Sequence, residues 1–205
     1  YSFPSGHTQG ATCLFFPLAL KARKFWIKLL CILAFLAIGF SRMYLGCHTP
    51  KDVLASMGIS LLVSALIWHY QEFFLDDTKH LKLIAAILAG LSLAVAAYSL
   101  ILLRNGTIEV KYAADCCKAA GAGLGFAIGW YVERTRLNFD TRTGNFWSQI
   151  LKLAAGLAAA LIIKEGFSLL FGSSILAKMV EYLILVLWVL VIYPYLFSKL
   201  LRRNV

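Results

Sequence analysis

Apolar residues form seven long runs along the chain, and short polar segments separate them. The runs cover approximately residues 11–20, 25–40, 53–68, 81–103, 113–132, 150–171 and 175–197. A run of about 20 apolar residues is long enough to cross a bilayer as an α-helix. The first three runs are shorter, but each helix can extend through its flanking polar residues. The pattern predicts an all-α integral membrane protein, a polytopic bundle of about seven transmembrane helices.

A polar stretch at residues 71–80 follows the third run and divides the chain. We interpret it as a loop between a first region, residues 1–72, and a second region, residues 73–205, that contributes additional transmembrane helices. One helix of the second region carries three glycines spaced four residues apart: Gly121, Gly125 and Gly129. This spacing permits close contact between helices. It favours packing within the chain, and the interface of a homodimer is the alternative.

The composition indicates a membrane environment. Hydrophobic residues make up 60% of the 205 residues and charged residues 15%, and the mean hydropathy is +0.77. A soluble domain of this length is much less apolar. The net charge is +10, but basic loops are the usual product of membrane topology and of contact with anionic headgroups. The expected partner is therefore the bilayer, and no nucleic acid is expected.

Two short polar segments stand out from this apolar background. The first is residues 1–7, with the sequence YSFPSGH. Ser5, Gly6 and His7 follow a proline and precede a long apolar run, so we expect them at the N-terminus of a helix. Unpaired backbone N–H groups and the helix dipole favour a phosphate there. Gly6 also lets the backbone approach a ligand closely.

The second polar segment supplies charged and titratable side chains. Thr49 and Pro50 are typical of an N-cap and a first helical residue, which places Asp52 in the first turn and close to His48. A carboxylate so placed suits the orientation of an imidazole. Arg42 offers a planar cation for two phosphate oxygens. Transfer of a phosphoryl group needs a nucleophile, a proton donor and fixed positive charge, and the two segments contain all three.

At these residues the chain resembles the type 2 phosphatidic acid phosphatase (PAP2) superfamily, which includes membrane lipid phosphatases, glucose-6-phosphatase and vanadium haloperoxidases. The match is to the second and third signature motifs of that family. All eight fixed positions are present: Pro4, Ser5, Gly6, His7, Ser41, Arg42, His48 and Asp52.

The resemblance implies a role for each residue. His48 would be the nucleophile that becomes phosphohistidine, Asp52 would orient it, and His7 would protonate the leaving group. The phosphoryl oxygens would be held by the remaining site residues: Arg42, Ser5, Ser41 and the N–H of Gly6. The family needs no metal for hydrolysis, so no metal and no other cofactor are expected.

The first motif of the family, a Lys with an Arg-Pro seven residues later, has no counterpart in this chain. The prolines are Pro4, Pro17, Pro50 and Pro194, and none of them follows an arginine. We expect the chain to be the C-terminal portion of a longer protein. On this interpretation it carries only part of the phosphate site and does not turn over substrate alone.

The distribution of Lys and Arg predicts the orientation. If both motifs lie on one side of the membrane, thirteen basic residues fall on the opposite side, and five fall on the motif side: Arg42, Lys51, Arg104, Lys111 and Lys118. The active site is therefore expected to face the outside of the cell (inner) membrane, with the C-terminus in the cytoplasm.

The sequence thus predicts a membrane phosphatase that hydrolyses a lipid phosphate or lipid diphosphate at the extracytoplasmic face. Two alternatives stay open. One is a lipid phosphotransferase, which passes the phosphoryl group to an acceptor other than water. The other is a transporter that kept the fold and lost hydrolysis, with Lys164, Glu165, Asp115 and Lys118 along its path. Lys164 and Glu165 need not pair with each other, because neighbours in sequence point about 100° apart on a helix. The alternative is a pairing with Asp115 or Lys118, if those helices touch.

Overall fold

A computed structural model describes residues 3–73, 80–140 and 145–202, and these residues contain helices and no β-strand. The chain divides into two compact units, Tyr1–Asp76 and Asp77–Val205. The all-helical membrane architecture predicted from the hydrophobic pattern is confirmed. Most of the polar stretch at residues 71–80, predicted as a loop, lies outside the described residues.

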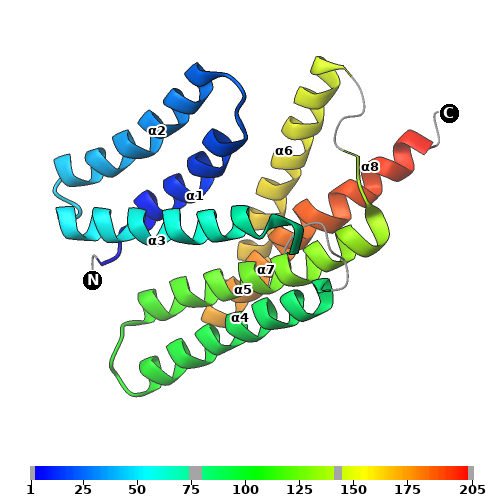
Figure 1. The fold of residues 1–205 in the computed structure, drawn as a ribbon. Helices are drawn as coiled ribbons and strands as arrows, with labels where there is room; N and C mark the ends of the chain where they lie inside the picture. The colour runs from blue at the N-terminus through cyan, green and yellow to red at the C-terminus, as the bar shows by residue number, and fades with distance from the viewer. Residues whose placement is uncertain (1–2, 74–79, 141–144, 203–205) are drawn as a thin grey trace. The chain divides into compact units, whose positions relative to one another are not determined.

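The first unit contains α1 (Gly6–Lys21), α2 (Phe25–Tyr44) and α3 (Pro50–His69), and α1 packs against both of the other helices. The second unit contains the remaining elements: α4 (Leu81–Arg104), α5 (Val110–Val132), the π-helix η2 (Glu133–Leu137), α6 (Phe146–Phe171), α7 (Ile175–Leu187), the π-helix η3 (Trp188–Ile192) and α8 (Tyr193–Arg202). Figure 1 shows α5 between α4 and α7, and α5 packs against both.

Within the described part of the chain, five helical segments are long and apolar enough to cross a membrane: Phe25–Tyr44, Pro50–His69, Leu81–Arg104, Phe146–Phe171 and Ile175–Lys199. The sequence pattern predicts about seven. The two others are α1, which is only 16 residues long, and α5, whose glycines and charged residues lower its hydropathy. The number seven is therefore approximate, because two of the predicted spans are short or polar.

The interior of the first unit is polar where α1 meets α3. The hydroxyl of Thr12 is buried and donates to the carbonyl of Thr8 at 2.8 Å. The Ser60 hydroxyl of α3 donates across the helix pair to the carbonyl of Gln9 at 3.4 Å. Small polar residues allow close helix contact in a membrane and satisfy their own hydrogen bonds. The bond from Ser60 to Gln9 thus joins α3 to α1.

Gly39 lets α2 approach this pair. A methyl group on Gly39 would lie 2.6 Å from the side chain of Met57 and 3.1 Å from that of Val53. Val53 is buried one residue after Asp52. The end of α2 and the start of α3 therefore meet through the smallest residue available.

The glycine stripe of α5 packs against α7 within the same chain. A Cβ on Gly121 would collide with the backbone carbonyl of Met179, and one on Gly125 would lie 2.7 Å from that of Leu183. A Cβ on Gly129 would lie 3.0 Å from the side chain of Leu190, in η3 at the end of α7. Of the two interpretations of the stripe, the structure supports packing inside one chain, because α7 occupies the face that the glycines leave open.

The seventh apolar run forms one continuous helix that contains a π-helical turn just before Pro194. The helix changes from α7 to the π-helical turn η3 and returns to α-helix at Tyr193. A proline inside a helix has no N–H to donate and clashes with the carbonyl four residues before it. A π-helical turn widens the backbone locally and is one way to accommodate this.

Charged residues inside the second unit pair locally. Lys164 contacts its neighbour Glu165 at 3.3 Å, and Lys118 contacts Asp115 at 2.8 Å. The alternative, in which Lys164 or Glu165 pairs with the charges of α5, is therefore not what the structure contains. Sequence reasoning also missed a buried pair in α7, where Lys178 contacts Glu181 at 2.8 Å.

Candidate active site

The turn between α2 and α3 determines where His48 stands relative to Arg42. Gly46 has a φ of 67°, the left-handed conformation that ends many helices. Its N–H donates to the carbonyl of Met43 at 3.0 Å, and the N–H of Cys47 donates to the carbonyl of Arg42 at 3.1 Å. This pair of bonds is a Schellman motif. The N–H of His48 also donates to the Arg42 carbonyl, at 3.3 Å.

The five residues between Arg42 and His48 therefore complete the last turn of α2 and form the Schellman turn that leads to α3. The same turn recurs between α4 and α5, where Gly106 has a φ of 70° and the N–H of Thr107 donates to the carbonyl of Leu102 at 2.9 Å. In that second turn, Ile108 and Tyr112 occupy the places of the histidine and the aspartate. The backbone motif is thus shared, and only the first copy carries titratable side chains suited to phosphate chemistry.

The first turn of α3 positions Asp52. Thr49 is the N-cap and Pro50 the first helical residue, as the sequence predicts. The Thr49 hydroxyl accepts from the N–H of Asp52 at 3.4 Å, and the Asp52 carboxylate accepts from the N–H of Thr49 at 2.9 Å. These reciprocal bonds form a capping box, which holds the carboxylate in one orientation.

His48 lies beside this carboxylate. The distance between His48 Nδ1 and Asp52 Oδ2 is 3.7 Å, and the Asp52 side chain is only 6% exposed. Nδ1 is buried and has no hydrogen-bond partner among the described residues. Because Nδ1 faces Asp52, the other ring nitrogen, Nε2, is the one that can act on a ligand.

The N-terminus of α1 is docked onto the same region. Ser5 is the N-cap of α1 and is completely buried, and its N–H lies 3.5 Å from the carbonyl of Asp52. The Ser5 hydroxyl accepts from the hydroxyl of Thr8 at 2.9 Å. In Figure 1 the start of α1, the end of α2 and the start of α3 lie at the same end of the first unit. The two polar segments of the sequence therefore meet in space.

Gly6 and His7 are exposed at the first turn of α1. No side chain caps this helix, and a Cβ on Gly6 would have no heavy atom within 4 Å. The first backbone N–H groups of an α-helix have no partner within the helix, so an anion can bind them.

Arg42 is partly buried, and its Nε atom has no hydrogen-bond partner among the described residues. The hydroxyl of Ser41 instead donates to the carbonyl of Ile38 at 2.8 Å, within its own helix. A buried guanidinium nitrogen without a partner is costly in a folded protein. The guanidinium of Arg42 and the first N–H groups of α1 together form an electropositive site that can bind an anion.

Sequence reasoning missed two residues near this site. Thr8 is completely buried and holds the Ser5 hydroxyl, and its position three residues after Ser5 is the signal that could have found it. The ammonium group of Lys51 lies 6.0 Å from the ring centroid of Phe3 and connects the chain before α1 to the start of α3. Among the described residues, no three His, Cys, Asp or Glu side chains converge as a metal site would require.

Two sequence models of one family match the chain. Residues 1–76 match the PAP2 superfamily, and residues 117–203 match the transmembrane extension of PAP2 superfamily phosphatases. Together the two matches cover most of the chain, and each covers one of its two compact units in large part. The chain belongs to the PAP2 superfamily.

Two curated relatives from Bacillus subtilis (strain 168) are similar to part of the chain. Undecaprenyl-diphosphatase BcrC is 34% identical over 71 residues, which are 35% of this chain and 36% of that protein. Phosphatidylglycerophosphatase B is 33% identical over 82 residues, which are 35% of this chain and 40% of that protein. The chain thus spans less than half the length of either relative. No solved structure matches it.

Proposed function

We propose that the protein hydrolyses a monophosphate or diphosphate group on a lipid at the extracytoplasmic face of the membrane. The observation that carries the proposal is the convergence of Arg42, His48 and Asp52 with the open N-terminus of α1 in one unit. The buried Nε of Arg42 has no hydrogen-bond partner among the described residues, and a phosphoryl group supplies acceptor oxygens for such a donor.

The chemistry follows from the positions of these groups. The phosphoryl oxygens bind to Arg42 and to the N–H groups at the start of α1, and Nε2 of His48 attacks the phosphorus atom. The bond between phosphorus and the leaving oxygen breaks, and His7 donates a proton to that oxygen. Asp52 stabilises the positive charge that develops on the imidazole of His48.

A second step regenerates the site. Water attacks the phosphorus atom of the phosphohistidine, and His7, now neutral, accepts the proton that the water loses. The nitrogen–phosphorus bond breaks, and inorganic phosphate and neutral His48 are released. Both steps place negative charge on the same equatorial oxygens, so one set of donors serves both transition states.

The class of substrate is argued from the surroundings of the site. The site residues stand at the ends of α2 and α3, which are both long and apolar enough to cross a membrane. A lipid can keep its tail in the bilayer while its phosphate reaches these helix ends. One relative is named for undecaprenyl diphosphate and the other for phosphatidylglycerophosphate, which supports a lipid phosphate as the class.

The decisive experiment measures phosphate release by the complete protein, purified in detergent, from a panel of lipid phosphates with no added metal. We expect His48→Ala to lose all measurable turnover, because the nucleophile is removed. His7→Ala should lower kcat by roughly 10²- to 10⁴-fold, the usual contribution of a general acid. The matched control is His69→Ala, a histidine at the far end of α3, which should keep full activity.

The same assay separates the alternatives. A phosphotransferase would release phosphate only after an acceptor is added, whereas the proposed hydrolase releases it in buffer alone. A transporter would move its ligand equally well as wild type and as His48→Ala. Wild-type protein that releases no phosphate from any lipid, with or without an acceptor, would overturn the proposed function.

A further inference from the structure

The second unit contains an apolar cavity between α6 and η3 that the phosphatase chemistry does not use. Its volume is about 280 Å³, close to the lower end of the roughly 300 to 1,000 Å³ typical of small-molecule sites. Aliphatic side chains form much of the wall, including Leu153, Leu157 and Val189. These three are more than half exposed, at 65%, 57% and 58%. The cavity is therefore open to the surroundings of the helix bundle.

Two aromatic residues hold this cavity in shape. Trp188 Nε1 donates to the carbonyl of Gly156 at 3.3 Å, and the hydroxyl of Tyr193 donates to the carbonyl of Lys152 at 2.7 Å. The two rings lie 5.7 Å apart, centroid to centroid. A Cβ on Gly156 would approach the Tyr193 ring to 3.2 Å. Hydrogen bonds from Trp188 in η3 and Tyr193 in α8 to carbonyls of α6 thus hold the two walls of the cavity together.

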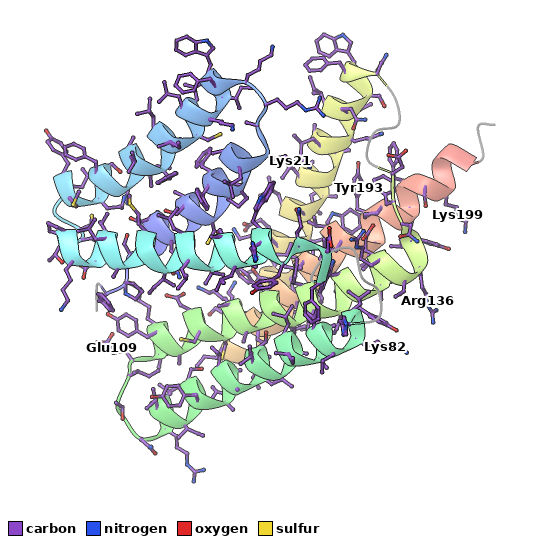
Figure 2. The ribbon with its side chains drawn as sticks, in the orientation of Figure 1. Lys21, Lys82, Glu109, Arg136, Tyr193 and Lys199 are labelled. Carbon is purple, nitrogen blue, oxygen red and sulfur yellow. The ribbon has the colours of Figure 1, made fainter. Side chains whose placement is uncertain are left out.

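One end of the cavity is basic. Lys152 and Gln149 line it, and the Lys152 ammonium lies 4.7 Å from the ring centroid of Phe197. Figure 2 shows Lys82, Arg136 and Lys199 toward the same end of the second unit as Tyr193, with Glu109 at the opposite end. Phosphate headgroups gather beside such basic ends of transmembrane helices.

The start of α6 has the features of a membrane–water boundary. Phe146 and Trp147 are the first two residues of the helix and are 72% and 73% exposed, and aromatic residues concentrate at this level of the bilayer. Lys152 follows about one and a half turns later, a depth from which a lysine reaches the headgroup layer. The cavity then continues along α6 toward the apolar interior.

We propose that this cavity binds one acyl chain of an anionic phospholipid, whose phosphate lies beside Lys152. An exposed apolar cavity on a membrane-spanning helix is filled by lipid, and the basic end selects an anionic headgroup over a zwitterionic one. The site is separate from the residues of the candidate active site, and the proposal does not depend on the proposed function.

The test uses the complete protein in vesicles of equal parts phosphatidylglycerol and phosphatidylcholine, followed by native mass spectrometry of the lipids that remain bound. We expect retained phosphatidylglycerol in wild type and a roughly fivefold lower ratio of phosphatidylglycerol to phosphatidylcholine in Lys152→Gln, since one lysine near the headgroups is removed. Gly156→Leu should abolish retention, because its side chain fills the cavity. Gly166→Leu is the matched control on α6, where a Cβ meets no atom within 4 Å.

A second measurement locates the chain directly. Phosphatidylglycerol brominated on its acyl chain should quench the fluorescence of wild type more than that of Trp188→Phe, since Trp188 lines the cavity. Equal retention of both lipids by wild type, or unchanged retention in both Lys152→Gln and Gly156→Leu, would overturn the proposal. So would a dimer that Gly156→Leu dissociates, because a second copy of the chain would then be the occupant.

Discussion

The carboxylate of Asp52 lies beside both Thr49 and His48 at the start of α3. It accepts the N–H of Thr49 at 2.9 Å and lies 3.7 Å from Nδ1 of His48. The first contact is part of the capping box of α3, whereas the second is the one that would orient the imidazole in the proposed reaction. A substitution can separate the two effects, because an amide still accepts a hydrogen bond but carries no charge.

At this residue scale, we expect Asp52→Asn to lower kcat by roughly 10²- to 10⁴-fold while changing the stability little, since the imidazolium loses its counter-charge. Thr49→Ala should instead lower the stability and leave kcat nearly unchanged. It removes the cap hydroxyl and lowers the free energy of unfolding by about 1 kcal/mol, with most of the activity retained. Phosphate-release kinetics and thermal unfolding in detergent measure both. A fully active Asp52→Asn protein would exclude an electrostatic role for Asp52.

At the scale of elements, the chain contains two copies of one helix–turn–helix connection. The first, around Gly46, joins α2 to α3 and holds Arg42 and His48 through the Arg42 carbonyl. The second, around Gly106, joins α4 to α5 without such side chains. Both glycines have a positive φ, so an alanine is strained at either position.

The pair provides its own control. Gly46→Ala and Gly106→Ala should each destabilise the protein by about 1 kcal/mol, because the left-handed conformation is unfavourable for alanine. Only Gly46→Ala should also reduce phosphate release, since it shifts His48 relative to Arg42. Equal activity losses in both variants, measured with matched folded fractions, would mean that the turn matters for stability alone.

At the scale of the whole molecule, α7 carries a buried carboxylate in the second unit, that of Glu181, which pairs with Lys178. Glu181 is 1% exposed, and Lys178 contacts it at 2.8 Å. One oxygen of Glu181 has no hydrogen-bond partner among the described residues. A buried carboxylate depends strongly on its cation, because the low dielectric penalises an isolated charge.

We therefore expect Lys178→Met to lower the free energy of unfolding by about 3 kcal/mol, the cost of leaving a buried charge unpaired. The double variant with Glu181→Leu should recover much of this loss, since neither charge remains. Lys164→Met is the control, because Lys164 and its partner Glu165 are both exposed. Unfolding in detergent compares the four proteins. A double variant less stable than Lys178→Met would argue against the buried pair.

The orientation in the membrane is a prediction for the whole chain that rests on the distribution of basic residues. Cys47 is exposed in the turn before α3, on the side where the active site is expected. A membrane-impermeant maleimide should label it in intact cells. A cysteine placed at Arg23, exposed between α1 and α2, should be labelled only after the membrane is opened. The opposite pattern would reverse the predicted topology.

The helical elements and the cap of α3 can be predicted from the sequence, because both depend on residues close to one another in the chain. The apolar runs predict the ends of six of the seven helices to within a few residues. Thr49 and Pro50 mark the start of α3. The seventh run also reads as one rod, but its pattern does not reveal the π-helical turn, which depends on how the backbone adapts to Pro194.

Tertiary structure alone decided which residues meet across helices. It docked Ser5 onto the first turn of α3 and placed the Ser60 hydroxyl of α3 against the Gln9 carbonyl of α1. It also directed the glycine stripe of α5 to α7 within the same chain. Hydropathy and spacing report the face of a helix but not its neighbour, because the choice of neighbour depends on the packing of whole side-chain surfaces.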